Sequence, residues 1–170
     1  MVVPFIPELL PPSFAASASK LRTLLFVGSV YRPDSDASTT SFGHPYPFPA
    51  LEHLESAAIL SRPVLHLCTP TLKVLSLRRQ VVPRGAQQLD STYFMTLLNL
   101  TRALSHTPLL EYLDVELPSG ANSTPIFVEL LRLKTLRLVG NVRDCALFLR
   151  FVRVPGNIDV RVCPKKRFGV

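Results

Sequence analysis

A recurring leucine spacing constrains the fold of this chain more than any other feature of its sequence. The pattern Leu-x-x-Leu-x-apolar begins at Leu21, Leu72, Leu110 and Leu133, and a degraded copy begins at Leu51. Leucine makes up 29 of the 170 residues, which is high enough for a repeat to be sought before any other organisation. Successive copies start 30, 21, 38 and 23 residues apart. The spacing therefore predicts repeated structural units with insertions of varying length between them.

Each copy has the length and alternation of a short β-strand. Because side chains alternate between the two faces of a strand, the spaced leucines point to one face. One copy cannot bury that face alone, so neighbouring copies must stack, as units of about 20–29 residues do in leucine-rich repeats. The predicted fold is α/β, an irregular leucine-rich-repeat solenoid of about five to six short parallel strands with helices and loops on its outer side. An α/β domain with buried parallel strands and no repeat is the alternative.

The segments between the predicted strands contain helix signals. Residues 90–106 carry an apolar stripe at helical spacing, with Asp90 or Ser91 available as the N-cap. Pro108 follows this segment, and because proline is poorly tolerated inside a helix, we expect the helix to end before it. Helix followed by strand is the order that a repeat array requires.

Further elements are predicted towards the C-terminus. A Thr-Pro pair marks a helix start, so residues 125–131 are expected to form a short helical turn. Residues 143–152 are expected to form a longer helix, with Asp144 near its start. A Pro-Gly-Asn turn at 155–157 should then lead into a sixth strand at 158–162, which closes the array.

We expect a single repeat domain over residues 20–163, which includes a long surface loop at 29–49. Residues 1–19 are apolar but interrupted by prolines and are expected to be an irregular N-terminal segment, and residues 164–170 form a basic tail. The first residues lack the basic start and continuous apolar stretch of a secretory signal. No apolar run reaches the roughly 18 residues that a membrane span requires. We therefore expect the protein in the cytoplasm or nucleus, with no membrane partner.

No catalytic, cofactor-binding or metal-binding constellation stands out. The four histidines occur singly, the three cysteines form no CxxC pair, and the glycine-rich motifs that cradle phosphates are absent. His66 and Cys68 could share one strand face, but a zinc site requires four ligands. The sequence therefore predicts a protein that is not an enzyme and holds no cofactor or metal, with its cysteines reduced.

Several motifs together resemble the leucine-rich-repeat region of F-box-like proteins from mushroom-forming fungi. They are LKVLSL at 72–77, LLEYLDVELP at 109–118 and LRLKTLRLVGN at 131–141, followed by an Asp-Cys-Ala-Leu helix and a Pro-Gly-Asn turn. The resemblance covers residues 20–163. In that family an F-box docks on the Skp1 adaptor of a cullin ubiquitin ligase, and the repeats recruit the substrate. The F-box has no counterpart in residues 1–20, so the resemblance implies the substrate-binding part of such a receptor, with a Skp1-type adaptor only if an F-box exists upstream.

The residues that alternate with the leucines define the opposite face of the predicted sheet. They mix an aromatic, charges of both signs and small apolar groups, which suits a protein partner better than a polyanion. Aromatic and arginine side chains dominate interface hot spots, so Tyr112 with Arg78 or Arg137 are the expected anchors. The partner-binding residues predicted for this concave wall are His53, Glu55, Arg78, Tyr112, Asp114 and Arg137.

Two alternatives to protein recognition stay open. The net charge of +7 favours a nucleic-acid-binding domain, and the basic tail at 165–167 adds to it, but the charge is spread thinly along the chain. Ragged repeats without a recognisable polar N-terminal cap would expose an apolar end, which favours a non-functional truncated fragment. Steep salt dependence of binding would distinguish phosphate recognition from protein recognition.

Overall fold

A computed structural model describes residues 19–26, 48–57, 67–78, 96–118 and 125–164. Residues 1–18 of the predicted N-terminal segment, most of the predicted loop at 29–49, His66 and the basic tail after Pro164 lie outside these ranges. Within them, no helix is long and apolar enough to cross a membrane.

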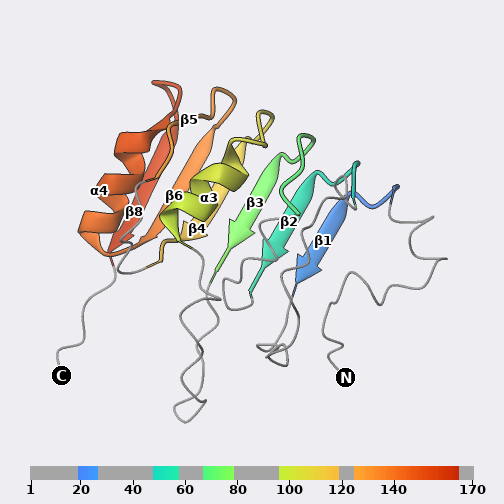
Figure 1. Ribbon diagram of the computed structural model, residues 1–170, viewed down its shortest axis with the longest axis horizontal. Helices are drawn as coiled ribbons and strands as arrows, with labels where there is room; N and C mark the ends of the chain where they lie inside the picture. Colours follow the sequence, from blue (N-terminus) through green and yellow to red (C-terminus); the bar gives the residue numbers. More distant parts are fainter. Residues whose placement is uncertain (1–18, 27–47, 58–66, 79–95, 119–124, 165–170) are drawn as a thin grey trace, which may run out of the picture.

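The main body is one sheet of six parallel strands that lie side by side in chain order (Figure 1). All six predicted strands are present, so the prediction of an α/β fold with short parallel strands is confirmed. In their order across the sheet the strands are β1 (Thr23–Phe26), β2 (His53–Ser56), β3 (Val74–Leu77), β4 (Tyr112–Glu116), β6 (Thr135–Gly140) and β8 (Asp159–Pro164).

The strand register aligns the repeat copies residue by residue. The second leucine of each copy pairs with its equivalent in the next strand, and Val160 of β8 continues the row. Within β2 to β6 these leucines are fully buried, because each one fills the space beside its neighbour. We call this side of the sheet the leucine face. Its central row is Leu24, Leu54, Leu75, Leu113, Leu136 and Val160.

A turn before the strand belongs to the repeated unit as well. The N–H of the leading leucine donates to the carbonyl three residues earlier at four of the strands, at 3.1 Å each time. The four acceptors are all buried, although their side chains differ in type. Phe48 is one of them, so this residue of the predicted loop 29–49 belongs to the core instead. The acceptor and leucine pairs are Phe48 and Leu51, Thr69 and Leu72, Thr107 and Leu110, and Leu130 and Leu133.

Helix α3 (Leu97–Leu104) lies within the predicted helix 90–106. Its N-cap is Thr96, whose hydroxyl accepts the Asn99 N–H at 3.1 Å, so the prediction of Asp90 or Ser91 as the cap of this helix is wrong. The residues at positions 97, 100, 101 and 104 are buried, as an amphipathic helix on a core requires. The helix ends at Leu104, before the proline at 108, as predicted.

The predicted helical turn at 125–131 is wrong. Residues Val128–Glu129 form β5, which pairs in parallel with β7 (Val152–Arg153) in a separate two-stranded sheet. The Leu130 N–H donates to the Arg153 carbonyl at 2.9 Å. Because the backbone N–H groups of this segment are used between strands, they are not available for a helix.

Helix α4 (Val142–Phe151) confirms the predicted helix at 143–152, displaced by one residue. Asn141 is its N-cap and accepts the Asp144 N–H at 2.8 Å, while the Asn141 amide donates to the Asp144 carboxylate. Gly156 and Asn157 then form the predicted turn into β8. The asparagine that ends the cleanest repeat copy therefore starts a helix.

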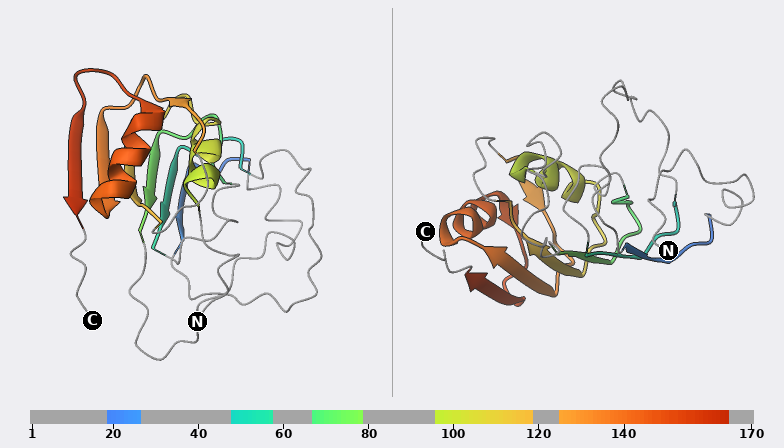
Figure 2. Two further views of the ribbon diagram at one scale, coloured as in Figure 1. Left: turned by 60° about the vertical axis from the view of Figure 1, so that its left-hand side comes forward. Right: turned by 90° about the horizontal axis from the view of Figure 1, so that it is seen from below.

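Both helices and the small sheet cover the same side of the main sheet (Figure 2). The leucine face packs against them, and the residues Leu100, Phe148 and Val128 contribute to one continuous core. The opposite side of the main sheet carries no described helix or strand. We call it the polar face.

Candidate partner-binding face

The polar face is formed by the residues that alternate with the leucines. The parallel register places these residues in straight rows across the sheet, so side chains from distant parts of the sequence become neighbours. The described residues of this face are Thr23, Leu25, His53, Glu55, Val74, Ser76, Arg78, Tyr112, Asp114, Glu116, Thr135, Arg137, Val139, Asp159, Arg161 and Cys163.

Asp114 lies at the centre of this face and organises its charges. Arg78, directly after β3, donates from Nε to Asp114 Oδ2 at 3.0 Å, and its Nη2 contacts the same oxygen. Arg137 from β6 places Nη1 3.6 Å from that oxygen. The two guanidinium groups thus approach one carboxylate oxygen from the two neighbouring strands.

Burial of the central carboxylate distinguishes it from the arginines around it. The Asp114 side chain is 0% exposed, whereas those of Arg78 and Arg137 are 51% and 39% exposed. A buried carboxylate is costly unless it is paired, and the arginines supply that pairing. The hydrogen bond and the charge of Asp114 raise the pKa of Arg78 above its ordinary value. Arg78 is therefore held in place while much of its guanidinium faces outwards.

The second oxygen of the same carboxylate differs from the first. Asp114 Oδ1 is buried and has no hydrogen-bond partner among the described residues. An ion pair with one unsatisfied oxygen is less favourable than a bidentate pair. Arg78 and Arg137 thus hold one carboxylate oxygen of Asp114, whereas the other oxygen has no partner among the described residues.

The structure brings four of the six predicted partner-binding residues together. These four residues, Arg78, Tyr112, Asp114 and Arg137, lie on or directly after three adjacent strands, and Tyr112 is half-buried. Asp114 is on the predicted face but is buried beneath the arginines, so it supports a surface without being accessible itself.

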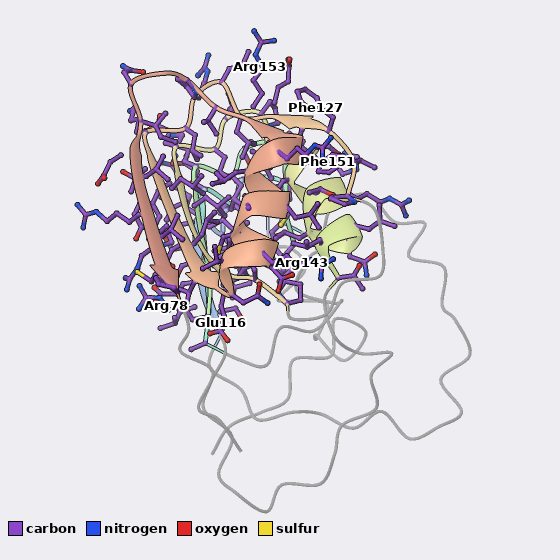
Figure 3. The ribbon with its side chains drawn as sticks, turned by 90° about the vertical axis from the view of Figure 1, so that its left-hand side faces the viewer. Arg78, Glu116, Phe127, Arg143, Phe151 and Arg153 are labelled. Atoms are coloured by element: carbon purple, nitrogen blue, oxygen red, sulfur yellow. The ribbon has the colours of Figure 1, made fainter. Side chains whose placement is uncertain are left out.

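The other two predicted residues lie on β2, one strand further away. His53 is half-buried and pairs with Val74, and Glu55 is exposed and pairs with Ser76. The small, buried Ser76 separates Glu55 from Asp114 in the register. Figure 3 shows Arg78 and Glu116 near the carboxyl ends of the strands.

Charges on the polar face are balanced by close partners. Arg161 on β8 donates from Nε to Asp159 Oδ2 at 2.9 Å, and this bond raises the pKa of Arg161. Together with the contacts at Asp114, each of the three arginines of this face thus lies beside a carboxylate. Phosphate binding depends on basic groups that lack such partners.

A second row of charges, just before the strands, was not predicted. Five residues of alternating sign follow one another across the sheet, with Lys73 Nζ 3.0 Å from Glu52 and Lys134 Nζ 2.6 Å from Glu111. The lysine hydrogen bonds lower the pKa of both glutamates. We call this row the charge ladder; its members are Arg22, Glu52, Lys73, Glu111 and Lys134.

The charge ladder follows from the backbone. The carbonyl of each ladder residue accepts two N–H groups from the next copy in four of the five cases, as Lys73 does from Glu111 at 2.8 Å and from Tyr112 at 3.0 Å. Equivalent side chains are therefore stacked. The signal in the sequence is a charged residue directly after each leading leucine, with its sign alternating from copy to copy.

The described residues contain no group of three or more histidine, cysteine, aspartate or glutamate side chains that could hold a metal ion. Cys68, Cys145 and Cys163 form no disulfide in the structure. Burial raises the pKa of Cys68 to about 12, which keeps this thiol protonated and unreactive.

No protein-family model, curated protein or solved structure matches this chain.

Proposed function

We propose that this chain is an irregular leucine-rich-repeat solenoid whose polar face binds another protein. The observation that carries the proposal is the pair of half-exposed arginines, Arg78 and Arg137, held over the buried carboxylate of Asp114. An arginine fixed before binding loses little conformational entropy when a partner arrives. Such side chains, with a neighbouring aromatic, are typical hot spots of protein interfaces.

The solenoid part of the proposal rests on the repetition of the unit. A buried turn residue, a leading leucine, a charge-ladder residue and a short strand recur in the same order at β2, β3, β4 and β6. The leucines of each unit pack beside those of the next one, as in stacked repeats. By resemblance, the proposed role is the substrate-binding part of an F-box-type ubiquitin ligase receptor in the cytoplasm or nucleus, with any Skp1-type adaptor contact belonging to an F-box.

Charge balance favours a protein partner over nucleic acid. The arginines of the polar face lie beside Asp114 or Asp159, and Glu55 and Glu116 add negative charge to the same face. A nucleic-acid surface would present unpaired basic groups along one groove. The net charge of +7 is a property of the whole chain and does not describe this face.

The test compares capture of proteins from cell extract by the full chain and by two double variants. Tyr112→Ala with Arg137→Ala removes the anchors of the polar face. Arg143→Ala with Arg150→Ala removes two exposed arginines from α4 and serves as the matched control. We expect a set of proteins that is lost with the first variant and retained with the second, while both variants keep the circular dichroism spectrum of the folded wild type at the assay temperature.

Purified members of that set should then bind the polar-face variant at least about tenfold more weakly in calorimetry, as hot-spot truncation does. If F-box residues fused ahead of the chain promote ubiquitylation of the same proteins, the receptor role is supported. Undiminished capture by the Tyr112 and Arg137 variant would contradict the proposal. Binding of DNA or RNA that falls steeply with added salt would instead favour a nucleic-acid partner.

A further inference from the structure

The last strand of the main sheet, β8, has an open edge. It pairs with β6 on one side, and no described strand pairs with it on the other (Figure 1). Val160 and Val162 lie on the leucine face beside Leu136 and Leu138, yet they are 44% and 42% exposed whereas those leucines are buried. The core of the sheet is therefore only partly covered at this end.

The backbone of β8 is arranged to accept another strand. The Asp159 N–H donates to the Lys134 carbonyl at 3.0 Å, so Asp159 directs its backbone groups towards β6. Because these groups alternate along a strand, those of Val160 and Val162 point to the open edge. An unpaired edge of this kind is a template for pairing with another chain.

The side chains of β8 are complementary to themselves. When a second β8 is placed antiparallel with the two Val160 residues opposite each other, Asp159 lies opposite Arg161 of the second copy, and Arg161 lies opposite Asp159. The two valines then form the hydrogen-bonded pair, and the two ion pairs fall at the positions where side chains approach most closely. Val162 meets Ile158 of the second copy on the leucine face.

We infer that β8 is a self-association edge, through which two copies of this chain join in an antiparallel pair with two-fold symmetry. The pairing extends the main sheet across both copies and covers the exposed valines of each. A two-fold contact uses the same surface twice, so the assembly closes at two copies. The polar face stays on the outside of the sheet in both copies.

The other open edge of the main sheet is a poorer partner for β8. At β1, the polar-face residues are Thr23 and Leu25, which offer no charge to Asp159 or Arg161. Pairing of β8 with β1 would also be head to tail, and such contacts continue into open chains of copies. The charges therefore favour β8 as its own partner.

The test measures the dimer dissociation constant of the full chain by sedimentation velocity over a range of concentrations. The variant Asp159→Arg places like charges opposite each other at both ion pairs and should raise the dissociation constant by about tenfold, equivalent to about 1.4 kcal/mol. Adding Arg161→Asp to it exchanges the two charges and should restore the dimer. Glu129→Arg, the same reversal in the ion pair of the small sheet, is the control and should leave the dimer unchanged.

A wild-type chain that sediments as a monomer at all concentrations would overturn the inference. Growth into a series of larger species would do so too, because it indicates head-to-tail pairing. Failure of the double variant to recover the dimer, while its circular dichroism matches the wild type, would show that these charges do not face each other. None of these outcomes depends on whether the polar face binds a partner.

Discussion

The two faces of the main sheet are built from alternate residues of the same strands, yet they differ in almost every property. The central row of the leucine face repeats leucine from β1 to β6 and is buried through most of its length. On the polar face, each strand contributes different chemistry, from the exposed Leu25 of β1 to the buried Asp114 of β4. In a single strand, one set of alternate side chains thus stabilises the core, and the other set is available for recognition.

Each face also contains a residue that departs from its pattern. Ser56 occupies a position on the leucine face, where its hydroxyl is buried and has no partner among the described residues. Asp114 lies on the polar face but is as buried as a leucine. These two residues show where the division between the faces is weakest, and they allow it to be tested.

The largest expected effect is loss of a central leucine. Leu113→Ala removes a fully buried side chain from the middle of the leucine row and should lower the free energy of unfolding by about 2–5 kcal/mol, because it leaves a cavity. Its neighbour Tyr112 is half-buried on the polar face. Tyr112→Ala should therefore lower the free energy of unfolding by less than half as much. Denaturant unfolding measures both, and equal losses would show that the two faces do not divide these roles.

The next effect concerns the ion pair on the polar face. Arg78→Ala leaves Asp114 without its hydrogen bonds and should cost about 1–3 kcal/mol, less than a fully buried pair because Arg78 is half-exposed. Arg137→Ala should cost less, since its Nη1 is 3.6 Å from the carboxylate.

A double-mutant cycle isolates the contribution of this pair. With Asp114→Val in the background, Arg78→Ala should be nearly neutral, giving a coupling energy of about 1–2 kcal/mol. Coupling near zero would mean that Arg78 does not stabilise the carboxylate.

Removal of the unpartnered hydroxyl on the leucine face should stabilise the protein. Ser56→Ala takes away a buried polar group without adding volume and is expected to raise the free energy of unfolding by about 0.5–1.5 kcal/mol. Ser76→Ala, on the polar face of the next strand, is the matched control and should change it by no more than about 0.5 kcal/mol. A destabilised Ser56 variant would imply a partner for the hydroxyl.

The smallest effect is expected at the charge ladder, which is exposed. The pKa values of Glu52 and Glu111 are lowered from their ordinary 4.5 by Lys73 and Lys134, so their contribution is complete above pH 4.5 and is lost as the pH falls through the lowered values. When both glutamates are changed to glutamine, the melting temperature should therefore decrease less between about pH 5 and pH 3 than it does in the wild type.

Glu55→Gln is the control for this measurement, since Glu55 is exposed and forms no ion pair among the described residues. It should leave the acid profile close to that of the wild type. An unchanged profile in the ladder variant would exclude a role for these pairs in stability.

The leucine face could be predicted from sequence because its signal is local. The spacing within each copy, together with alternation along a strand, was enough to place six strands and the buried leucines. Helix α4 was found for the same reason, from its own apolar pattern and its cap. Burial of Phe48 was missed because the turn residue varies in type between copies, from phenylalanine to threonine and leucine.

The parts that were missed depend on contacts between distant segments. Val128 forms a strand because Val152 lies beside it, and a Thr-Pro pair gives no sign of this. The cluster at Asp114 requires Arg78 from 36 residues earlier to end one strand away, which depends on the register of β3 against β4. Alternation along the strands predicts that these residues share one face. It does not predict that the arginines bury Asp114, because that depends on how the neighbouring strands align.

In four of the five units, the carbonyl of the charge-ladder residue accepts two N–H groups from the following copy, and this affects how the protein can evolve. It fixes the start of the next strand locally, so alignment is independent of how much chain intervenes, and copies that begin 30, 21, 38 and 23 residues apart keep one register. Segments between consecutive strands can then be lengthened, shortened or exchanged without disturbing the scaffold. Insertions between the strands can therefore add new binding loops without changing the sheet.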